Sequence, residues 1–285
     1  MIGECKLCKL DKDLQLSHIV PKSIYKWIKK TSGSGRMRRG SNMNVPVQDG
    51  LKFYLLCKEC EQLFSPYEKY FMEEVFTKIN DAECISTFSY DSRLFYFLAS
   101  VWWRITIKSL EGKEVKNCKF VEDIYKCEKS FRNFLLTYSY PKEFDQNYLI
   151  LVDYVESAPN EMKNLNTFFT RTVDPWLMFD DTSCFLSLRI PKLWFFCNIK
   201  GLSARYLEHI KILAEGGYYL TTSKVVSDKH LSPFMNQRLT AYNRMLEKVS
   251  KYQVEKINQD HVNKKDKFLN SKSFEAWKRD VDREK

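Results

Sequence analysis

Short strand-like segments, with one short helix between them, dominate the first 60 residues. Residues 14–20 and 51–56 are each rich enough in apolar side chains to favour a strand, and Pro21 ends the first of them. Residues 23–30 carry apolar side chains at helical spacing. Residues 31–40 are rich in Gly and Ser, so we expect a flexible loop there.

Helical periodicity takes over between residues 65 and 136. The segment Ser65-Pro66-Tyr67-Glu68 has the form of a capping box with Pro at the first helical position, so it predicts the start of a helix. Residues 91–110 are mostly apolar and aromatic, which predicts a central buried helix. A further helix is predicted over residues 121–136.

From residue 147 onward the pattern is typical of short strands between turns. The predicted strands are 148–152, 167–170, 184–188, 193–196 and 216–220. Residues 202–213 are predicted as a helix. The Lys-rich tail, from about residue 233 to 285, carries charges of both signs at close spacing, which favours a solvated helical arm.

Composition indicates a packed protein with a locally basic segment. Among the 285 residues, 44% are hydrophobic and 15% aromatic, which excludes disorder as the main state. The formal net charge is +10, and the first 60 residues hold twelve Lys or Arg against five Asp or Glu, so they contribute +7 of it. This local positive charge is compatible with a nucleic-acid partner.

The sequence predicts a cytoplasmic protein without a membrane partner. It has no run of about 18 apolar residues, and the segment MIGECKLCKLDK lacks the apolar core of a secretory leader. In a reducing compartment, the nine cysteines do not favour a disulfide framework. Five of them stand singly and are expected to act as small buried hydrophobes. They are Cys84, Cys118, Cys127, Cys184 and Cys197.

The other four cysteines form two C-x2-C pairs, Cys5 with Cys8 and Cys57 with Cys60. Two such pairs can bind one tetrahedral zinc ion through four thiolates, so we expect a structural Zn2+ site that stabilises the fold and performs no chemistry. Two alternatives remain open. One is a thioredoxin-like redox pair, which requires a C-x-x-C at a helix start, and the other is chance spacing.

Two segments around these pairs carry a family resemblance. Ser-His-Ile-Val-Pro at residues 17–21 follows the first pair, and Leu-Leu-Cys-x-x-Cys-Glu at residues 55–61 contains the second. Together they resemble the zinc-containing form of the HNH, or ββα-metal, endonucleases. That family has a catalytic histidine at the end of its first strand and a Cys-x-x-Cys segment at the start of its helix. The resemblance covers residues 5–70 and is strongest to bacterial HNH-like proteins, several branches of which are linked to defence against phage.

The resemblance implies an α+β chain in two parts. Residues 1–82 would form a zinc-bound ββα treble-clef module. Residues 83–285 would form a larger mixed helical and β domain for sensing, substrate recognition or oligomerisation, with the helical tail at its end. This second domain would bind a partner protein or a second copy of the chain.

The resemblance also implies a division of roles. His18 would be the general base that activates water. A Mg2+ or Mn2+ ion, separate from the zinc, would hold the scissile phosphate and stabilise the leaving oxygen. Seven basic residues would neutralise backbone phosphates. They are Lys22, Lys26, Lys29, Lys30, Arg36, Arg38 and Arg39.

Several positions depart from the family pattern. Ser17 stands where an acidic metal ligand is usual, Lys52 and Glu61 where Asn is common, and Phe64 and Ser65 where a final His or Asn is expected. A hard divalent ion needs oxygen ligands, so replacements must come from the nearby carboxylates. These are Asp49, Glu61 and Glu68. Either they rebuild a catalytic site or the module has lost catalysis.

Each candidate also has a simpler explanation. His18 could be a buried histidine packed on the zinc module, and Asp49 could belong to a turn with Gly50. Glu61 is favoured near a helix N-terminus by the macrodipole, and Glu68 could serve the capping box. The basic run could be a solvated surface.

Two functions therefore remain in view. The first is a metal-dependent nuclease that hydrolyses phosphodiester bonds of DNA or RNA, with anti-phage defence as its expected context. The second is a non-catalytic zinc-finger module that binds nucleic acid or a protein.

Overall fold

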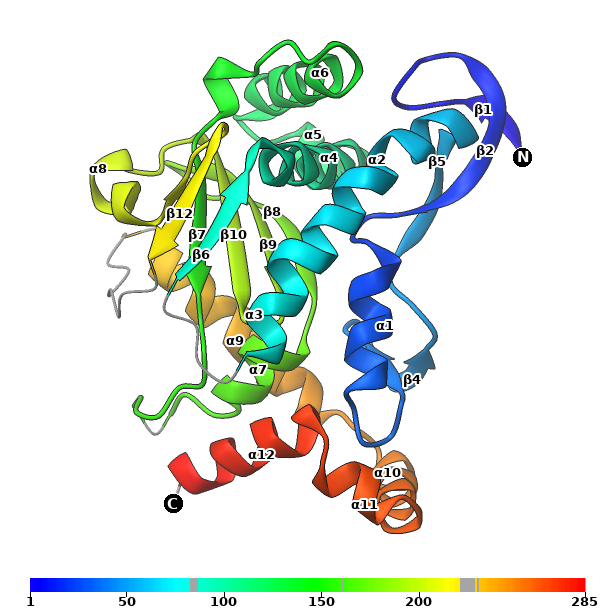
Figure 1. Ribbon diagram of the computed structural model, residues 1–285, viewed down its shortest axis with the longest axis vertical. Helices are drawn as coiled ribbons and strands as arrows, with labels where there is room; N and C mark the ends of the chain where they lie inside the picture. Colours follow the sequence, from blue (N-terminus) through cyan, green and yellow to red (C-terminus); the bar gives the residue numbers. More distant parts are fainter. Residues whose placement is uncertain (83–86, 160, 221–228, 230, 285) are drawn as a thin grey trace.

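The computed structural model describes residues 1–82, 87–159, 161–220, 229 and 231–284. Helices and antiparallel sheets alternate along the chain, which is therefore mixed in class (Figure 1). The N-terminal part lies along one side of a five-stranded sheet, and the C-terminal helices run beneath both.

The N-terminal part is built on a three-stranded antiparallel sheet in the order β1-β2-β5. Its elements are β1 (Ile2–Glu4), β2 (Asp11–His18), α1 (Lys22–Lys30), β3 (Met37–Arg39), β4 (Asn42–Val47), β5 (Lys52–Cys57) and α2 (Lys58–Tyr70). The two predicted strands and the predicted helix between them are confirmed. The prediction of a flexible loop over 31–40 is wrong at its end, because β3 pairs with β4 in a hairpin.

The capping box predicted at Ser65 is wrong. The helix starts at Lys58, directly after Cys57, so Ser65 and Glu68 lie inside it together with Pro66. The second cysteine pair straddles this helix start, and β5 runs into it without a turn. The helix continues through the π-helical segment η1 (Phe71–Phe76) into α3 (Thr77–Asp81).

Helix α4 (Ser92–Ser109) is the central buried helix that the sequence predicted. Thirteen of its residues, Leu94 to Thr106, are buried, and the Asp91 side chain caps its start by accepting a hydrogen bond from the Arg93 N–H. Helix α6 (Val121–Thr137) packs beside it.

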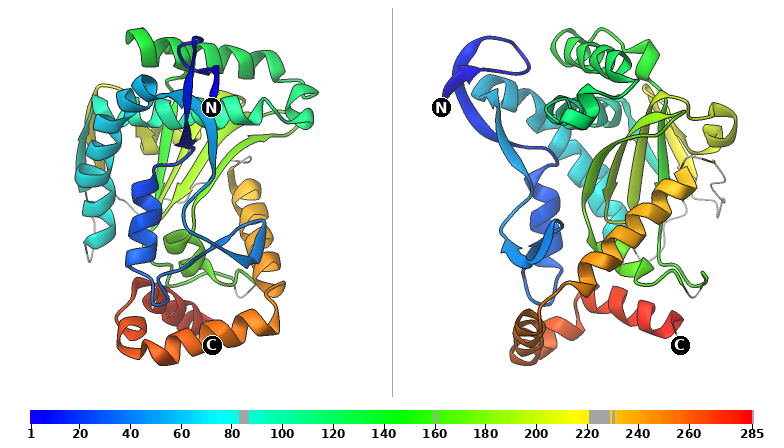
Figure 2. Two further views of the ribbon diagram at one scale, coloured as in Figure 1. Left: turned by 90° about the vertical axis from the view of Figure 1, so that its right-hand side faces the viewer. Right: turned by 180° about the vertical axis from the view of Figure 1, so that it is seen from behind.

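The large sheet has the strand order β11-β7-β10-β9-β8 and is covered on both faces (Figure 2). On β10, Leu193, Phe195 and Cys197 join the core shared with α4 and the N-terminal part. Trp194 and Phe196, which alternate with them, join a second core with α7 and α9. Because both faces are buried, the strand is apolar at almost every position rather than at every second one.

The strands of the large sheet and the remaining small elements are short. They are β7 (Asn147–Leu151), β8 (Asp174–Phe179), β9 (Cys184–Ile190), β10 (Leu193–Lys200), β11 (Lys211–Ile212), α5 (Lys113–Lys116), η2 (Lys142–Phe144), α8 (Ala204–Leu207) and η3 (Glu208–Ile210). A separate pair is formed by β6 (Thr87–Asp91) and β12 (Gly216–Leu220).

Two predictions in this half of the chain are wrong. Residues 167–170 lie in a helix, α7 (Leu165–Arg171), because Asp280 from the tail binds the N–H groups at its first turn and Phe168 and Phe169 both pack into the second core. Residues 202–213 form only short helical turns, and the chain then pairs with β7 as β11. Strand β8 was not predicted.

The tail is helical, as predicted, but it is not a solvated arm. Its helices are α9 (Leu231–Glu247), α10 (Lys251–Asn263), α11 (Lys265–Leu269) and α12 (Lys272–Arg283). Helix α9 crosses one face of the large sheet, and α12 packs on α7 (Figure 2). The tail therefore connects the two parts of the molecule.

One hydrophobic core runs from Cys5 of the N-terminal part through α4 to the large sheet. The boundary predicted at residue 82 lies directly after α3, and the division into two domains stays a prediction. Within the described residues, no helix is long and apolar enough to cross a membrane.

Candidate metal centre and nucleic-acid interface

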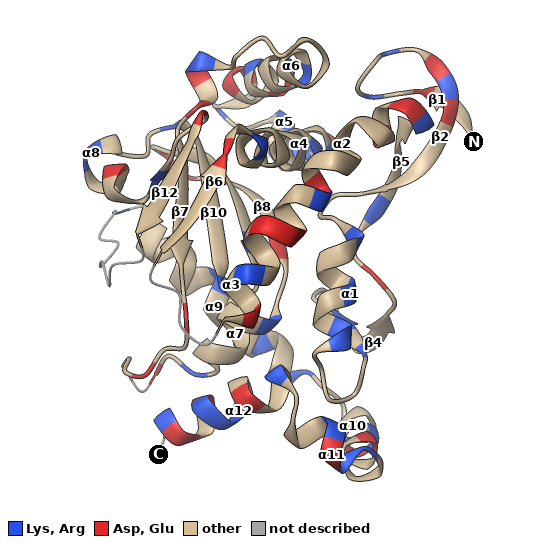
Figure 3. Cartoon of the chain, in the orientation of Figure 1, with Lys and Arg blue, Asp and Glu red and all other residues tan. Residues whose placement is uncertain are grey.

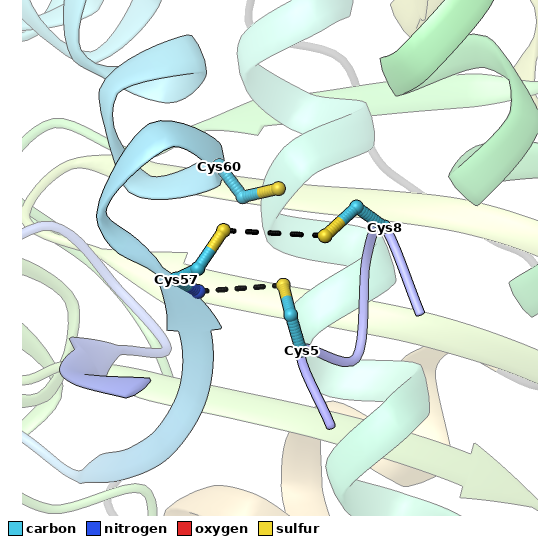
Figure 4. A group of neighbouring side chains, drawn as sticks. All are labelled: Cys5, Cys8, Cys57 and Cys60. Atoms are coloured by element: carbon cyan, nitrogen blue, oxygen red, sulfur yellow. Dashed lines mark hydrogen bonds between the residues drawn. The ribbon is translucent and has the colours of Figure 1, made fainter. Parts of the chain in front are cut away.

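Four cysteine side chains converge where β5 enters α2 (Figure 4). The ligand atoms of Cys5, Cys8, Cys57 and Cys60 all lie within 4.8 Å of one another, and the sulfurs of Cys8 and Cys57 are 4.0 Å apart. A tetrahedral zinc ion with Zn–S bonds of about 2.3 Å separates its sulfurs by about 3.8 Å. The four cysteines are thus positioned to bind a metal ion and are compatible with structural zinc.

The loop that carries Cys5 and Cys8 is shaped by its own backbone. Lys9 takes a positive φ of 63°, and the Lys9 N–H donates to the Cys5 carbonyl at 2.9 Å. The Lys6 N–H donates to the carbonyl of Leu55 on β5 at 2.8 Å, which fixes the loop against the second cysteine pair. Since both pairs meet, neither an isolated redox pair nor chance spacing explains them well.

Backbone donors favour the thiolate form of Cys5, whereas burial raises the pKa of the Cys57 and Cys60 thiols in the same cluster. Burial on its own would raise the pKa of the Cys5 thiol, but N–H groups of Cys8, Cys57 and Leu7 lower that pKa to about 7. The Cys57 N–H donates to the Cys5 sulfur at 3.3 Å. A thiolate is the form that binds metal.

Among the single cysteines, Cys127, Cys184 and Cys197 are buried, as expected, and Cys118 is half-buried. Burial raises the pKa of the Cys127, Cys184 and Cys197 thiols, which suits inert core positions. Cys84 lies outside the described residues.

His18 and Asp49 lie together at the end of β2. The His18 Nε2 atom is 3.3 Å from Asp49 Oδ2, and the two side chains are 14% and 15% exposed. Lys52, which faces His18 across the β2–β5 pair, places its Nζ 3.4 Å from the same Asp49 oxygen. Burial alone would raise the pKa of Asp49, but His18 and Lys52 lower it below its usual value.

Glu61 contacts Ser17 rather than His18. The Ser17 hydroxyl, fully buried, donates to Glu61 Oε2 at 2.6 Å. Neighbouring residues on a strand point to opposite faces, so Ser17 faces α2 while His18 faces away from it. The position that carries an acidic ligand in the HNH pattern is therefore occupied here by a hydroxyl that binds the carboxylate on the helix.

Glu68 is held by a buried arginine. Arg104 of α4 is 1% exposed, and its Nη2 atom donates to Glu68 Oε1 at 2.9 Å. Its Nη1 atom donates to the His18 backbone carbonyl at 2.8 Å, and its Nε atom donates to the Ser100 carbonyl at 3.1 Å. Glu68 therefore neutralises Arg104, and the capping role expected for it is wrong.

The four predicted catalytic residues do not form one carboxylate cluster. Among the described residues, the four cysteines are the single group of three or more His, Cys, Asp or Glu whose ligand atoms could hold a metal ion. His18 and Asp49 meet, whereas Glu61 and Glu68 each bind a different partner. Among the described residues, therefore, no group of three or more carboxylates or histidines is preassembled for a divalent ion.

The predicted basic residues fall into two groups. Lys22, Lys26 and Lys30 are exposed on α1, and none of them forms an ion pair with an acid in the described part of the chain. Lys29 is half-buried on the same helix, and Arg39 is exposed on β3. The lysines on α1 are free to meet phosphates.

Arg36 and Arg38 are engaged by the tail. The Arg36 Nη1 atom lies 3.3 Å from Asp260 of α10. Arg38 donates from Nη1 to the Met43 carbonyl at 2.7 Å and to the Gln253 side chain at 3.0 Å, and burial lowers its pKa. These two arginines hold the β3–β4 hairpin on α10 as well as carrying charge.

Sequence reasoning missed Arg104 and Tyr25. A lone arginine within the apolar run 94–106 signalled a buried cation that needs a partner, and that signal pointed to Arg104. Tyr25 of α1 packs on Gly50 so closely that a Cβ there would lie 2.1 Å from the ring Cζ atom. Only a glycine at residue 50 lets α1 approach this closely beside Asp49. The sequence indicated a turn at Asp49 and Gly50 but not this contact.

Comparisons of the chain with protein-family models, with curated proteins and with solved structures found no match.

Proposed function

We propose that this protein hydrolyses phosphodiester bonds of nucleic acid, with His18 as the general base. The observation that carries the proposal is the contact between His18 Nε2 and Asp49 Oδ2 at 3.3 Å, at the end of β2 and beside the basic helix α1. The order strand, strand and helix with two cysteine pairs supports the HNH-like interpretation of the sequence. The zinc ion would stabilise this module without taking part in the reaction.

The chain's own residues suggest how the proton would move. His18 Nε2 is buried 3.3 Å from Asp49 Oδ2 without a well-formed hydrogen bond to it. Nδ1 is therefore the nitrogen that would accept a proton from the attacking water. The Asp49 carboxylate would orient the imidazole and stabilise its cationic form, as a carboxylate does beside a catalytic histidine. Lys22, Lys26 and Lys30 would bind the flanking phosphates.

The Mg2+ or Mn2+ ion implied by the resemblance does not fit a preformed site. Glu61 binds Ser17 and Glu68 binds Arg104, which leaves Asp49 alone beside His18. Hard cations require several oxygen ligands, so protein groups here could supply only part of a coordination shell. The involvement of such an ion is tested by the metal dependence of cleavage.

The test is a cleavage assay with the zinc-loaded full chain. Plasmid DNA, single-stranded DNA and RNA are each incubated with Mg2+, Mn2+ or EDTA. We expect cleavage that is lost in His18→Ala and reduced about 10- to 100-fold in Asp49→Asn. His209→Ala, an exposed histidine in η3, is the matched control and should retain activity. Absence of cleavage with every substrate and metal would refute the proposal.

A second function, non-catalytic binding of nucleic acid, is favoured by the engagement of Glu61 and Glu68 in internal contacts. It predicts salt-dependent binding without turnover, and His18→Ala would leave the affinity unchanged. Replacement of Lys22, Lys26 and Lys30 by Glu would abolish binding under either function. The His18 variant therefore separates the two.

A further inference from the structure

The tail lies directly against residues 31–40 of the N-terminal part, here called the basic loop, through α11 and the turn from α11 into α12. Phe268 packs on Gly33 so closely that a Cβ at residue 33 would lie 2.7 Å from the ring Cδ2 atom. The Gly33 N–H donates to the Ser273 hydroxyl at 3.0 Å, and the Lys272 N–H donates to the Thr31 carbonyl at 3.1 Å. A tail more than 200 residues away in sequence thus forms one surface with the loop.

The β3–β4 hairpin is fixed to the same tail from its other side. Asn44 donates from Nδ2 to the Lys248 carbonyl at 3.1 Å and accepts from the Ser250 N–H at 2.8 Å. Together with the Arg36 and Arg38 contacts to α10, these bonds hold the hairpin in place. Loop and tail are therefore positioned together and would meet a ligand as a unit.

The tail adds positive charge to this surface. Lys264, Lys265 and Lys267 are all exposed at the α10–α11 corner, with Asp266 as the acid among them. Asp260, the nearest acid on α10, faces Arg36 and is largely neutralised by it. Figure 3 shows Lys and Arg along α1 and again at this corner, on the same side of the molecule.

We propose that the nucleic-acid interface is composite, running from the lysines of α1 across the basic loop onto Lys264, Lys265 and Lys267 of the tail. Its ligand is the phosphate backbone of a duplex, because α1 alone spans only about 14 Å and a duplex offers phosphates over a longer track. This inference rests on the proposed function, since it describes how the substrate of that function is held.

The test compares two triple variants with the same change in net charge. In one, Lys264, Lys265 and Lys267 are replaced by Glu. In the other, Lys113, Lys116 and Lys119, exposed in and after α5, are replaced by Glu. Figure 1 places α5 and α11 at opposite ends of the molecule. The probe is a 20-base-pair DNA duplex, with a duplex RNA of equal length as the second arm, titrated at several salt concentrations.

We expect the tail variant to lose at least tenfold in affinity and to reduce the salt slope of log K by about two to three, as counterion release from three fewer contacts requires. The α5 variant should change affinity less than threefold. Equal losses in both variants, or tighter binding by the tail variant, would overturn the proposal. Tighter binding would mean that the tail covers the site and does not extend it.

A third variant separates this inference from the proposed function. Replacement of Lys22, Lys26 and Lys30 by Glu should abolish binding. If this α1 variant fails to bind while the tail variant binds normally, the composite surface is wrong and the proposed function stands. If the unmodified chain binds neither duplex, the composite surface is overturned, and the cleavage assay with single-stranded DNA and RNA decides the proposed function separately. A second tail variant, with Gln in place of Lys264, Lys265 and Lys267, removes the charges without reversing them. A loss of affinity in the same direction in this variant would show that the effect does not come from misfolding.

Discussion

Arg104 donates a hydrogen bond from its Nη1 atom to the backbone carbonyl of His18, at a distance of 2.8 Å. Through this bond the central helix α4 holds the end of β2, where the candidate general base lies. The same guanidinium binds Glu68 of α2. The position of His18 therefore depends on a buried cation in a different part of the chain.

Replacing Arg104 with Met should lower the free energy of unfolding by about 3 kcal/mol. The methionine fills similar space, but Glu68 and the His18 carbonyl lose their partner. Urea denaturation in zinc-containing buffer measures the difference. Arg93→Gln, which breaks an exposed pair with Asp91, is the control and should cost much less, because solvent screens that pair. A loss equal to that of the control would contradict the role of Arg104.

Combining Arg104→Met with Glu68→Gln should restore part of the lost stability. The second change removes the carboxylate that the first leaves without a partner. The coupling in this double-mutant cycle should be about 1 kcal/mol or more. Additive losses would show that the two side chains do not interact in solution.

Metal removal should unfold the N-terminal part. We expect one zinc ion per chain by elemental analysis, and loss of it in Cys60→Ser or on strong chelation, with a decrease in thermal stability. Cys118→Ser is the matched control, because this half-buried cysteine lies outside the cluster, and it should retain the metal. A metal-free chain of unchanged stability would refute a structural site.

The contact of Asp49 with His18 and Lys52 should make stability depend on pH at the acid end. Its pKa is lowered in the folded state, so its stabilising contribution is complete above the unfolded value of about 4 and is lost as pH falls through the folded pKa. Asp49→Asn should therefore cost about 1 kcal/mol at neutral pH, and less as pH falls through the folded pKa of Asp49. A carboxyl NMR titration should give Asp49 a pKa below 3.8, and a value above it would contradict the contact.

Asp280 should anchor the tail to α7. It is 2% exposed and accepts bonds from the N–H groups of Asn166 and Thr167 and from the Thr167 hydroxyl, at 2.7 to 2.9 Å. Asp280→Asn weakens these charge-assisted bonds and should cost about 2 kcal/mol. Hydrogen exchange in α7 and α12 should increase, whereas Asp266→Asn on the exposed corner should leave it unchanged. Unchanged exchange in both would show that the anchor is elsewhere.

The elements that the sequence predicted well are those that depend on residues close together in the chain. The strand at 14–20, the helix at 23–30 and the central helix at 91–110 follow from side-chain periodicity, which acts over a few residues. The convergence of Cys5, Cys8, Cys57 and Cys60 was also predictable, because two C-x2-C pairs in one chain are typical of a four-thiolate zinc site.

The failures occurred where distant segments decide local structure. Residues 167–170 have a composition that favours a strand. They are helical because Asp280, distant in sequence, accepts a hydrogen bond from the Thr167 N–H in the first turn of α7. Ser65-x-x-Glu68 has the pattern of a helix start, but the chain is already helical from Lys58, and Glu68 serves Arg104. The tail has the charge pattern of a solvated arm, but it binds both α7 and the basic loop.

The sequence by itself determined the cysteine pairs, the buried helix α4 and the concentration of positive charge near the N-terminus, because each depends on residue type and short spacing. Only the tertiary structure decided the pairing of His18 with Asp49, the engagement of Glu61 by Ser17 and of Glu68 by Arg104, and the joining of the tail to the basic loop. These depend on which polar groups are brought together when a continuous apolar core closes around them. Periodicity specifies a buried face but not the partner that a buried polar group must find.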